Sequence, residues 1–341
     1  MPQKPAARPD TLAAGTSVTR ALSRVIDAAV EARHWRSAHA FRKELGVRPR
    51  AALPVSYNDK MLWRRVFDRN PAFVGYCDKL ETKAIFRRHA PGLALPRTLW
   101  TGSDPAALPD ALRHPDVVVK MNAGCARNWF FHERSDDEAS FRKACRRWLE
   151  RPYGRRYGEW AYGEIERRLF AEEVLVHDPG RMDEIKVHLF SGEVFYALIY
   201  RGEKLPTGLS GIFDETGRRL RVTNTLVARN PARALPATYR VPDCFGEAMR
   251  VARRIATGTD YLRVDFMVVD GKLHGGEITP YPTAGLMTNS DPAVLAAMGR
   301  SWDLGRSWFL STPQSGWRAA YQRLLRDHVE ALGSEAIPTL A

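Results

Sequence analysis

The chain has 341 residues, a length that predicts two packed units or one elaborated α/β domain. Hydrophobic residues make up 44% and charged residues 27%, which excludes a wholly disordered chain, collagen and a coiled coil. Lys and Arg outnumber Asp and Glu by 52 to 39, and the net charge of +13 would attract anions such as nucleotides, acidic sugars, nucleic acid or anionic lipid.

The first part of the chain is predicted to be mainly helical. Apolar residues recur at helical spacing, and Asp78 with Glu81 three residues later forms a capping-box pattern that predicts a helix start. In chain order we expect a tail over 1–17, one long or two short helices over 18–45, helices over 58–67 and from 78 to about 90, a strand over 95–100 and a short helix over 103–112.

The second part is predicted to be rich in strands joined by tight turns. We expect strands over 117–120, 129–131, 169–176, 184–189, 192–201, 211–213, 261–269 and 272–278, with helices over 138–149, 244–257 and 314–332. Tight hairpins join antiparallel strands, so the fold class is α+β with two lobes rather than a run of βαβ units. The last helix is expected to pack through Trp317, Tyr321 and Leu324.

The sequence contains no signs of membrane insertion or of a disulfide framework. No run approaches the roughly 18 consecutive apolar residues of a membrane-spanning helix, and residues 1–17 lack the apolar core of a signal peptide. The four cysteines lie far apart without a CxxC pair. We therefore expect a cytoplasmic protein with reduced thiols and no membrane span.

One predicted hairpin carries two acids. The turn Asp270-Gly271 joins its strands and places Asp265 roughly opposite Glu277. Two buried carboxylates this close would repel each other unless a cation lay between them. Together with nearby Thr279 they suit Mg²⁺, which keeps waters and phosphate oxygens in its other positions. The alternative is an ordinary salt bridge from Asp265 to Arg263, and spacing alone leaves both interpretations open.

Further candidate residues lie at strand ends. Lys120 could bind phosphate, and the small-residue loop over 122–128 could close over phosphates, although no Walker pattern is present and an ordinary hairpin tip is the better explanation of the loop taken alone. Glu172 and Glu173 end a strand that could present its backbone to an adenine, the alternative being solvated glutamates. Lys186 and Arg201 lie on neighbouring strands, and their cations could face one site.

In their order along the chain, these segments resemble the ATP-grasp superfamily, most closely its teichuronopeptide-biosynthesis (TupA-like) branch, which is linked to cell-surface polysaccharide assembly. The resemblance covers about residues 57–286. It rests on the helices at Asn58-Asp59-Lys60 and Asp78-Lys79, and on Val-Val-Lys-Met-Asn (118–122), Ala-Glu-Glu-Val-Leu (171–175), Ile-Lys-Val-His-Leu-Phe-Ser-Gly (185–192), Arg-Val-Asp-Phe (263–266) and Gly-Glu-Ile-Thr-Pro-Tyr-Pro (276–282).

The resemblance implies a fold of two α+β lobes clasping ATP, with a helical N-terminal extension and a C-terminal helix. The implied divisions are 1–50, an N-terminal subdomain over 51–115, an N-lobe over 116–176, a C-lobe over 177–312 and the helix over 313–341. The implied ATP contacts are Lys120, Asn122, Glu172, Glu173, Leu175, Asp178 and Lys186; the implied catalytic residues are Lys186, Arg201 and Arg263; the implied Mg²⁺ ligands are Asp265, Glu277 and Thr279.

The activity implied by the resemblance is ATP-dependent joining of a carboxylate to an amine through an acyl-phosphate. The partners would be an amino acid or amine and a small molecule or glycan precursor that carries a carboxylate, such as a uronic acid. Alternatives are a kinase that phosphorylates a hydroxyl at the same ATP site, and a non-catalytic polyanion binder. Aromatic residues do not interleave with the arginine clusters as base stacking would require, so no nucleic-acid partner is expected.

Overall fold

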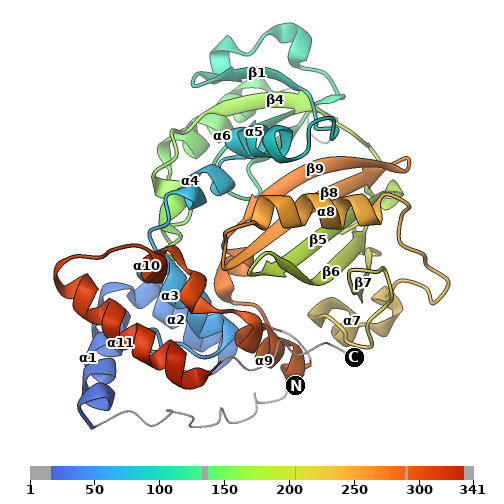
Figure 1. Cartoon of the computed structure of the whole chain (residues 1–341). Coiled ribbons are helices and arrows are strands. Elements are labelled where there is room, and N and C mark those ends of the chain that lie inside the picture. Colours follow the sequence, from blue (N-terminus) through green and yellow to red (C-terminus); the bar gives the residue numbers. More distant parts are fainter. Residues whose placement is uncertain (1–16, 133–136, 204, 289–290, 334–341) are drawn as a thin grey trace.

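The computed structural model describes residues 17–132, 137–203, 205–288 and 291–333. Its strands form two antiparallel sheets (Figure 1). The four-stranded sheet has the order β1-β4-β2-β3, and the five-stranded sheet has the order β7-β6-β5-β8-β9. The strands are β1 (Thr98–Gly102), β2 (Val117–Met121), β3 (Asn128–Phe130), β4 (Leu169–Glu173), β5 (Met182–Phe190), β6 (Glu193–Arg201), β7 (Leu209–Phe213), β8 (Tyr261–Val269) and β9 (Lys272–Thr279).

Helices cover the sheets and form a separate layer beside them (Figure 1). The α-helices are α1 (Ser17–Arg33), α2 (Trp35–Leu45), α3 (Tyr57–Val66), α4 (Ala72–Cys77), α5 (Lys79–His89), α6 (Glu138–Glu150), α7 (Thr225–Arg229), α8 (Phe245–Ala256), α9 (Pro292–Ser301), α10 (Trp308–Ser311) and α11 (Gly316–Leu332). Short 3₁₀ helices are η1 (Pro105–Ala107), η2 (Asp110–Leu112), η3 (Trp160–Gly163), η4 (Pro179–Arg181), η5 (Pro231–Arg233), η6 (Pro282–Gly285) and η7 (Leu304–Arg306).

The helical layer combines the two ends of the chain. In Figure 1 the blue helices α1 to α3 lie beside the red helices α9 to α11. The Tyr321 hydroxyl of α11 donates a hydrogen bond to the carbonyl of Ala52 at 2.8 Å, and its ring centroid lies 4.6 Å from that of Phe67. The exposed fraction of Trp317 is 66%, so the expectation that it packs inward is wrong; the buried face of α11 contains Tyr321, Gln322, Leu325 and His328.

The five-stranded sheet has one apolar and one polar face. Alternation along β5 and β8 directs Ile185, Val187, Val264 and Phe266 toward the core that includes α8. On the other face, Lys186 pairs in register with Asp265. Because successive side chains of a strand point to opposite faces, the polar cluster that includes Lys186 and Asp265 is separated from the α8 core by one sheet thickness.

Helix α5 connects the two sheets. It contacts β9 and α8 of the larger unit, and one of its lysines reaches a glutamate on β4 of the smaller sheet. The Asp78 carboxylate accepts a hydrogen bond from the Leu80 amide at 2.9 Å, so the predicted helix start is confirmed.

Most predicted elements are present, with shifted ends. The helical stretch over 18–45 is two helices interrupted at His34, and the expected short helix over 103–112 is the pair of 3₁₀ turns η1 and η2. In the part of the chain that the structure describes, no helix has the length and hydropathy required to cross a membrane.

Candidate functional site

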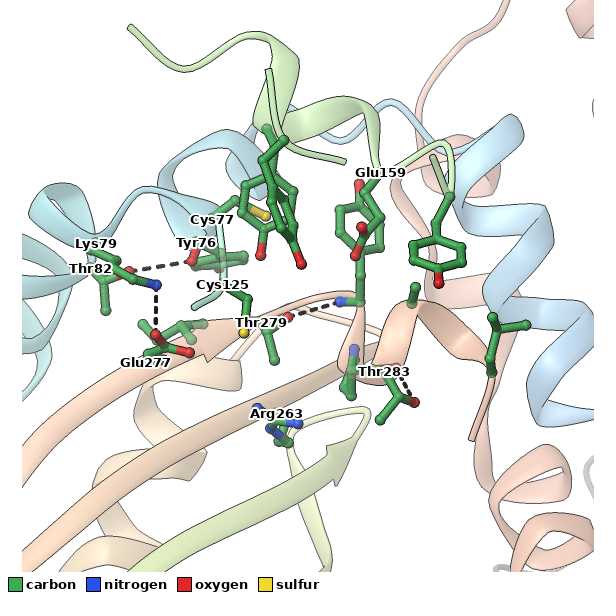
Figure 2. Close-up of a pocket in the computed structure, with 18 of the residues that line it drawn as sticks. Tyr76, Cys77, Lys79, Thr82, Cys125, Glu159, Arg263, Glu277, Thr279 and Thr283 are labelled. Carbon is green, nitrogen blue, oxygen red and sulfur yellow. Dashed lines mark hydrogen bonds and ion pairs between the residues drawn. The ribbon is translucent and has the colours of Figure 1, made fainter. Parts of the chain in front are cut away.

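A cavity of about 500 Å³ lies against the β8–β9 hairpin at the end remote from its turn, where Arg263, Glu277 and Thr279 line it. Its wall combines the α4–α5 junction, the loop after β2, the segment before η3 and the turn after β9. Figure 2 shows Lys79 and Glu277 on one side of it, with Cys125, Thr279 and Arg263 close by and Glu159 on another side. The cavity therefore borders several of the residues that the sequence singled out.

A β-bulge brings Asp265 and Glu277 onto the same face of the hairpin. Val264 pairs with Ile278 and Phe266 with Gly275, so Asp265 faces the two residues Gly276 and Glu277 of β9. A Cβ at position 276 would lie 2.8 Å from the Asp265 carbonyl oxygen, which explains the glycine there. The predicted juxtaposition of the two acids is confirmed in register.

Each of these two acids is paired with its own cation. The Arg263 guanidinium donates Nε and Nη2 hydrogen bonds of 2.7 Å to the two Asp265 oxygens, and Lys79 Nζ lies 2.6 Å from Glu277 Oε1. Asp265 is buried, whereas the Glu277 side chain is 52% exposed because it borders the cavity. The salt-bridge interpretation of Asp265 therefore describes this state. The expectation that Glu277 is buried is wrong.

The cations determine the protonation of this cluster. Attraction to Lys79 holds the pKa of Glu277 at about 2, although the loss of hydration at the cavity wall acts in the opposite direction. Burial would lower the pKa of Arg263, but Asp265 outweighs that effect and raises it. Both side chains are thus charged throughout the neutral pH range.

Thr279 lies on the same face as Arg263, its partner in the strand register. Its hydroxyl oxygen accepts a hydrogen bond of 3.2 Å from the Tyr281 amide, and its side chain borders the cavity. One lone pair of the hydroxyl thus supports the turn into η6.

The smaller sheet contributes a second charge cluster, centred on Glu172. Lys83 Nζ lies 2.6 Å from Glu172 Oε2, and Lys120 forms an ion pair with Oε1. Burial would raise the pKa of Glu172, but the two lysines outweigh it and the pKa is lowered. The two predicted nucleotide-binding residues Lys120 and Glu172 therefore lie together, and in this state they are paired with each other.

Asn122 joins the loop after β2 to the start of α5. Its Nδ2 donates to Asp78 Oδ2 and to the Glu166 carbonyl, each at 3.0 Å, and its Oδ1 accepts from the Arg168 amide at 2.9 Å. Its own carbonyl accepts from the Lys79 amide at 3.0 Å. The Asn122 side chain is therefore a structural link in this state.

The residues predicted to contact the adenine and the ribose lie at the end of β4 and in the segment directly after it. Glu173 accepts a hydrogen bond from the Arg97 amide at 2.8 Å, and half-buried Leu175 lies just after the strand. Asp178 is exposed and accepts from the Gly180 amide at 2.9 Å, which caps η4. None of the three borders the cavity of about 500 Å³.

Lys186 and Arg201 do not face one site, and that expectation is wrong. Lys186 of β5 pairs with Leu198 of β6, so these two side chains share one face of the sheet. Arg201 lies three residues beyond Leu198, an odd number, so its side chain points to the opposite face. Lys186 Nζ binds Glu203 at 2.7 Å on the polar face. Arg201 forms two 2.8 Å hydrogen bonds with Asp183 on the α8 side.

Sequence reasoning did not assign a role to Lys79, Lys83 or Glu203. Lys79 and Lys83 are four residues apart on α5 and therefore share one helix face. That spacing directly after the Asp78 cap was the available signal. Glu203 lies in the turn after β6, and no pattern in the sequence linked it to Lys186.

The donor set fits a magnesium ion only if phosphate supplies further ligands. Among the residues that the structure describes, no group of three or more His, Cys, Asp and Glu side chains could hold a metal. Mg²⁺ is commonly bound through one or two carboxylates with waters and substrate phosphates in its remaining positions. Asp265 and Glu277, across one bulge, match that smaller requirement.

Comparison with known proteins supports one family. The sequence model of the TupA-like ATPgrasp family matches residues 59–301. No curated protein sequence matches the chain.

Several solved structures are similar at low identity. The ATP-grasp ligase PsnB complexed with minimal precursor has 16% identity and a TM-score of 0.33, with 76% of this chain and 62% of that chain covered. D-alanine–D-alanine ligase from Bacillus anthracis complexed with ATP has 15% identity and a TM-score of 0.37, covering 75% and 67%. L-amino acid ligase from Bacillus licheniformis has 14% identity and a TM-score of 0.36, covering 62% and 44%. The chain thus spans less than two thirds of the PsnB chain.

Proposed function

Because the chain belongs to the TupA-like ATP-grasp family, we propose that it is an ATP-dependent carboxylate–amine ligase working through an acyl-phosphate. The supporting observation is the set of carboxylate–cation pairs around the β8–β9 hairpin and β4: Lys79 with Glu277, Arg263 with Asp265, and Lys83 and Lys120 with Glu172. Such pairs can exchange partners when an anionic nucleotide arrives, so the charge needed to bind it is already in place.

In this proposal the smaller sheet binds the nucleotide. Lys120 turns from Glu172 to the phosphates, and the backbone from Glu172 to Leu175 receives the adenine, with Glu173 flanking it. Asp178 serves the ribose, and Asn122 holds the phosphate loop. Lys120 and Glu172 already form an ion pair at one position, which favours a shared role.

The larger sheet carries the reacting groups. Asp265 and Glu277 would hold Mg²⁺, with the Thr279 hydroxyl beside them, and the ion would neutralise charge on the phosphates as they transfer. Lys186 and Arg263 lie on the same face as Asp265, so their cations can attract the phosphoryl group and the substrate carboxylate. Arg201 is not part of this proposal because it lies on the opposite face.

Two steps complete the proposed reaction. A carboxylate oxygen of the substrate attacks the γ-phosphorus of ATP, and ADP leaves with the electron pair of the broken bond. The amine nitrogen then attacks the acyl carbon, the bond from that carbon to the phosphate oxygen breaks, phosphate leaves with the electron pair, and the nitrogen loses one proton to the departing phosphate. The chain's cations serve both steps because charge accumulates on phosphate oxygens each time.

The proposed substrates are small. The carboxylate belongs to a uronic acid, an amino acid or another precursor of a surface glycan or related metabolite, and the reaction takes place in the cytoplasm. The net charge of +13 favours acidic substrates of this kind. Nucleic acid is not among the proposed partners.

The test is Mg-ATP turnover with the purified chain against a panel of amino acids, uronic acids and amino sugars. ADP, free phosphate and product mass are followed together. We expect ADP, phosphate and a product lighter than its two substrates by one water. A phosphorylated product without free phosphate would replace the ligase by a kinase, and absence of ATP binding would contradict both.

The matched variants are Glu277→Ala in the cluster and Glu247→Ala, which changes an exposed residue of α8. We expect turnover to fall about a hundredfold or more in the first and to stay within twofold in the second. Equal turnover in Glu277→Ala and the parent chain would remove this acid from the reaction.

A further inference from the structure

Besides Glu277, the cavity wall contains a buried acid, Glu159, whose role the charge pairs leave open. Glu159 precedes η3 and lines the cavity together with Tyr76, Tyr153, Tyr157, Tyr162 and Tyr281. Figure 2 shows it away from the Lys79–Glu277 pair, among side chains that point into the pocket. The cavity therefore continues from the cationic cluster into a region that is aromatic and acidic.

Glu159 is buried, with an exposed fraction of 5%. Within the described ranges, no hydrogen bond or ion pair to its carboxylate is present. The attraction of Arg65, a buried guanidinium whose Nη1 donates to the Tyr157 carbonyl, opposes the effect of burial, but no direct bond joins it to the Glu159 carboxylate in the described residues. A buried carboxylate without a hydrogen-bonded cation is costly, so this position favours a cation supplied from outside the chain.

The surrounding rings point to the kind of cation. Tyrosine faces attract ammonium groups through their quadrupole, and the attraction is stronger where water is excluded. A carboxylate among several tyrosines thus selects a positively charged amine over a neutral or anionic group. Burial raises the pKa of Glu159 to about 7 although Arg65 opposes the shift, so burial outweighs the attraction of that guanidinium.

We propose that Glu159 and the surrounding tyrosines form the binding site for the ammonium group of the acceptor substrate. This inference rests on the ligase activity proposed above and names the chemistry of its second substrate. The acceptor would lie with its amine toward Glu159, across the cavity from Lys79 and Arg263, which would attract the anionic partner, so that the two reacting groups face each other. The two walls of one cavity would thereby sort two substrates by charge.

The test compares cationic probes with neutral probes of the same shape. D-glucosamine is paired with D-glucose and L-alaninamide with L-lactamide, so that in each pair an ammonium is exchanged for a hydroxyl. Binding to the full chain is measured by calorimetry and saturation-transfer NMR without ATP. We expect at least one ammonium probe to bind at least tenfold more tightly than its hydroxyl partner. Equal or absent binding of both ammonium probes would overturn the proposal.

Three variants assign the effect to Glu159. Glu159→Gln should reduce the ammonium preference to within twofold, and Glu159→Asp, which keeps the charge, should retain part of it. Glu164→Gln, an exposed glutamate five residues further on, should leave it unchanged. Melting curves check folding, since Glu159 also acts on Arg65. A melting shift in Glu159→Gln with an unaltered ammonium preference would make the residue structural only and overturn the proposal.

The outcome is separable from that of the proposed function. Turnover with an amine whose KM is the same in Glu159→Gln and the parent chain would leave the ligase standing and remove the Glu159 site. Ammonium binding that depends on Glu159, without any ATP turnover, would leave the site standing and remove the ligase.

Discussion

Lys79 Nζ lies 2.6 Å from Glu277 Oε1, although the two residues are 198 positions apart in the chain. The first residue of α5 is thereby joined to the C-terminal end of β9, and the ion pair closes one side of the cavity.

Replacing Lys79 should therefore change the acid titration of the site. Attraction to Lys79 is the largest cause that holds the pKa of Glu277 at about 2, while the loss of hydration at the cavity wall acts in the opposite direction. In Lys79→Ala the pKa of Glu277 should rise, so that protonation begins at a higher pH. The acid limb of the pH profile of ATP turnover should move upward by about one unit or more. An unchanged acid limb would contradict the assignment.

A matched control is available on the same hairpin. Lys272 is exposed at the start of β9, and Lys272→Ala should leave the acid limb in place. The folding free energy offers an independent check with a defined sign. A carboxyl whose pKa is lowered on folding stabilises the fold above its unfolded pKa, and that contribution is lost as the pH falls toward 2. This acid-dependent loss should be smaller in Lys79→Ala.

Replacing Lys186 of β5 and replacing Arg201 of β6 should have different effects. Lys186→Met removes a cation from the polar face, where it pairs with Glu203, and should lower kcat by about a hundredfold if that face carries the reaction. Arg201→Met acts on the opposite face and should leave kcat within about threefold, while lowering the melting temperature through loss of its two bonds to Asp183. Steady-state kinetics and melting curves measure both. Equal losses of kcat would indicate that the faces are not functionally distinct.

Gly276→Ala should destabilise the hairpin. The new Cβ would lie 2.8 Å from the Asp265 carbonyl oxygen, so the bulge must open or shift. We expect the free energy of unfolding to fall by about 1–3 kcal/mol, as for other overpacked positions. Gly163→Ala is the matched control because its Cβ would meet nothing within 4 Å. Denaturant titration of both variants measures the difference, and equal stabilities would show that the bulge is loosely packed.

The buried ion pair of Arg64 and Asp260 should be far more sensitive than a surface pair. Arg64 is fully buried and lies 2.5 Å from Asp260, and its guanidinium also donates to the Tyr261 carbonyl at 3.0 Å. Asp260→Asn leaves a buried guanidinium without its counter-ion and should cost about 3–5 kcal/mol of unfolding free energy.

Asp270→Asn provides the surface comparison. Asp270 and Arg181 are 3.3 Å apart, with side chains 75% and 69% exposed, so breaking this pair should cost at most about 1 kcal/mol. Chemical denaturation of the two variants under one set of conditions gives the contrast. A cost for Asp260→Asn as small as that of Asp270→Asn would contradict the burial argument.

Local patterns in the sequence predicted much of the fold. The β8–β9 hairpin follows from a two-residue turn at Asp270-Gly271 between alternating strands, and the start of α5 follows from Asp78. Both signals act over a few residues. The α+β class and, from the order of the motifs, the family were predicted correctly without coordinates.

Features that depend on distant contacts were not accessible. Nothing near Lys79 in the sequence indicates that it pairs with Glu277. The opposite orientations of Lys186 and Arg201 depend on the pairing register of β5 and β6, and a shift of that register by one residue would change which face each side chain occupies. Trp317 is exposed because α11 packs through the face that contains Tyr321 and Leu325. That orientation depends on contacts with the N-terminal part of the chain, such as the hydrogen bond from Tyr321 to the Ala52 carbonyl. The roles of the individual site residues remain predictions.

The hydrogen bonds of Asn122 have a mechanical consequence. They connect the loop after β2 with the first turn of α5, through the Asp78 carboxylate and the Lys79 amide. A shift of that loop toward a nucleotide would therefore pull the start of α5 with it, and Lys79 would move relative to Glu277. Binding a phosphate and uncovering the Glu277 carboxylate would then be a single movement, transmitted by the side chain and the backbone carbonyl of Asn122.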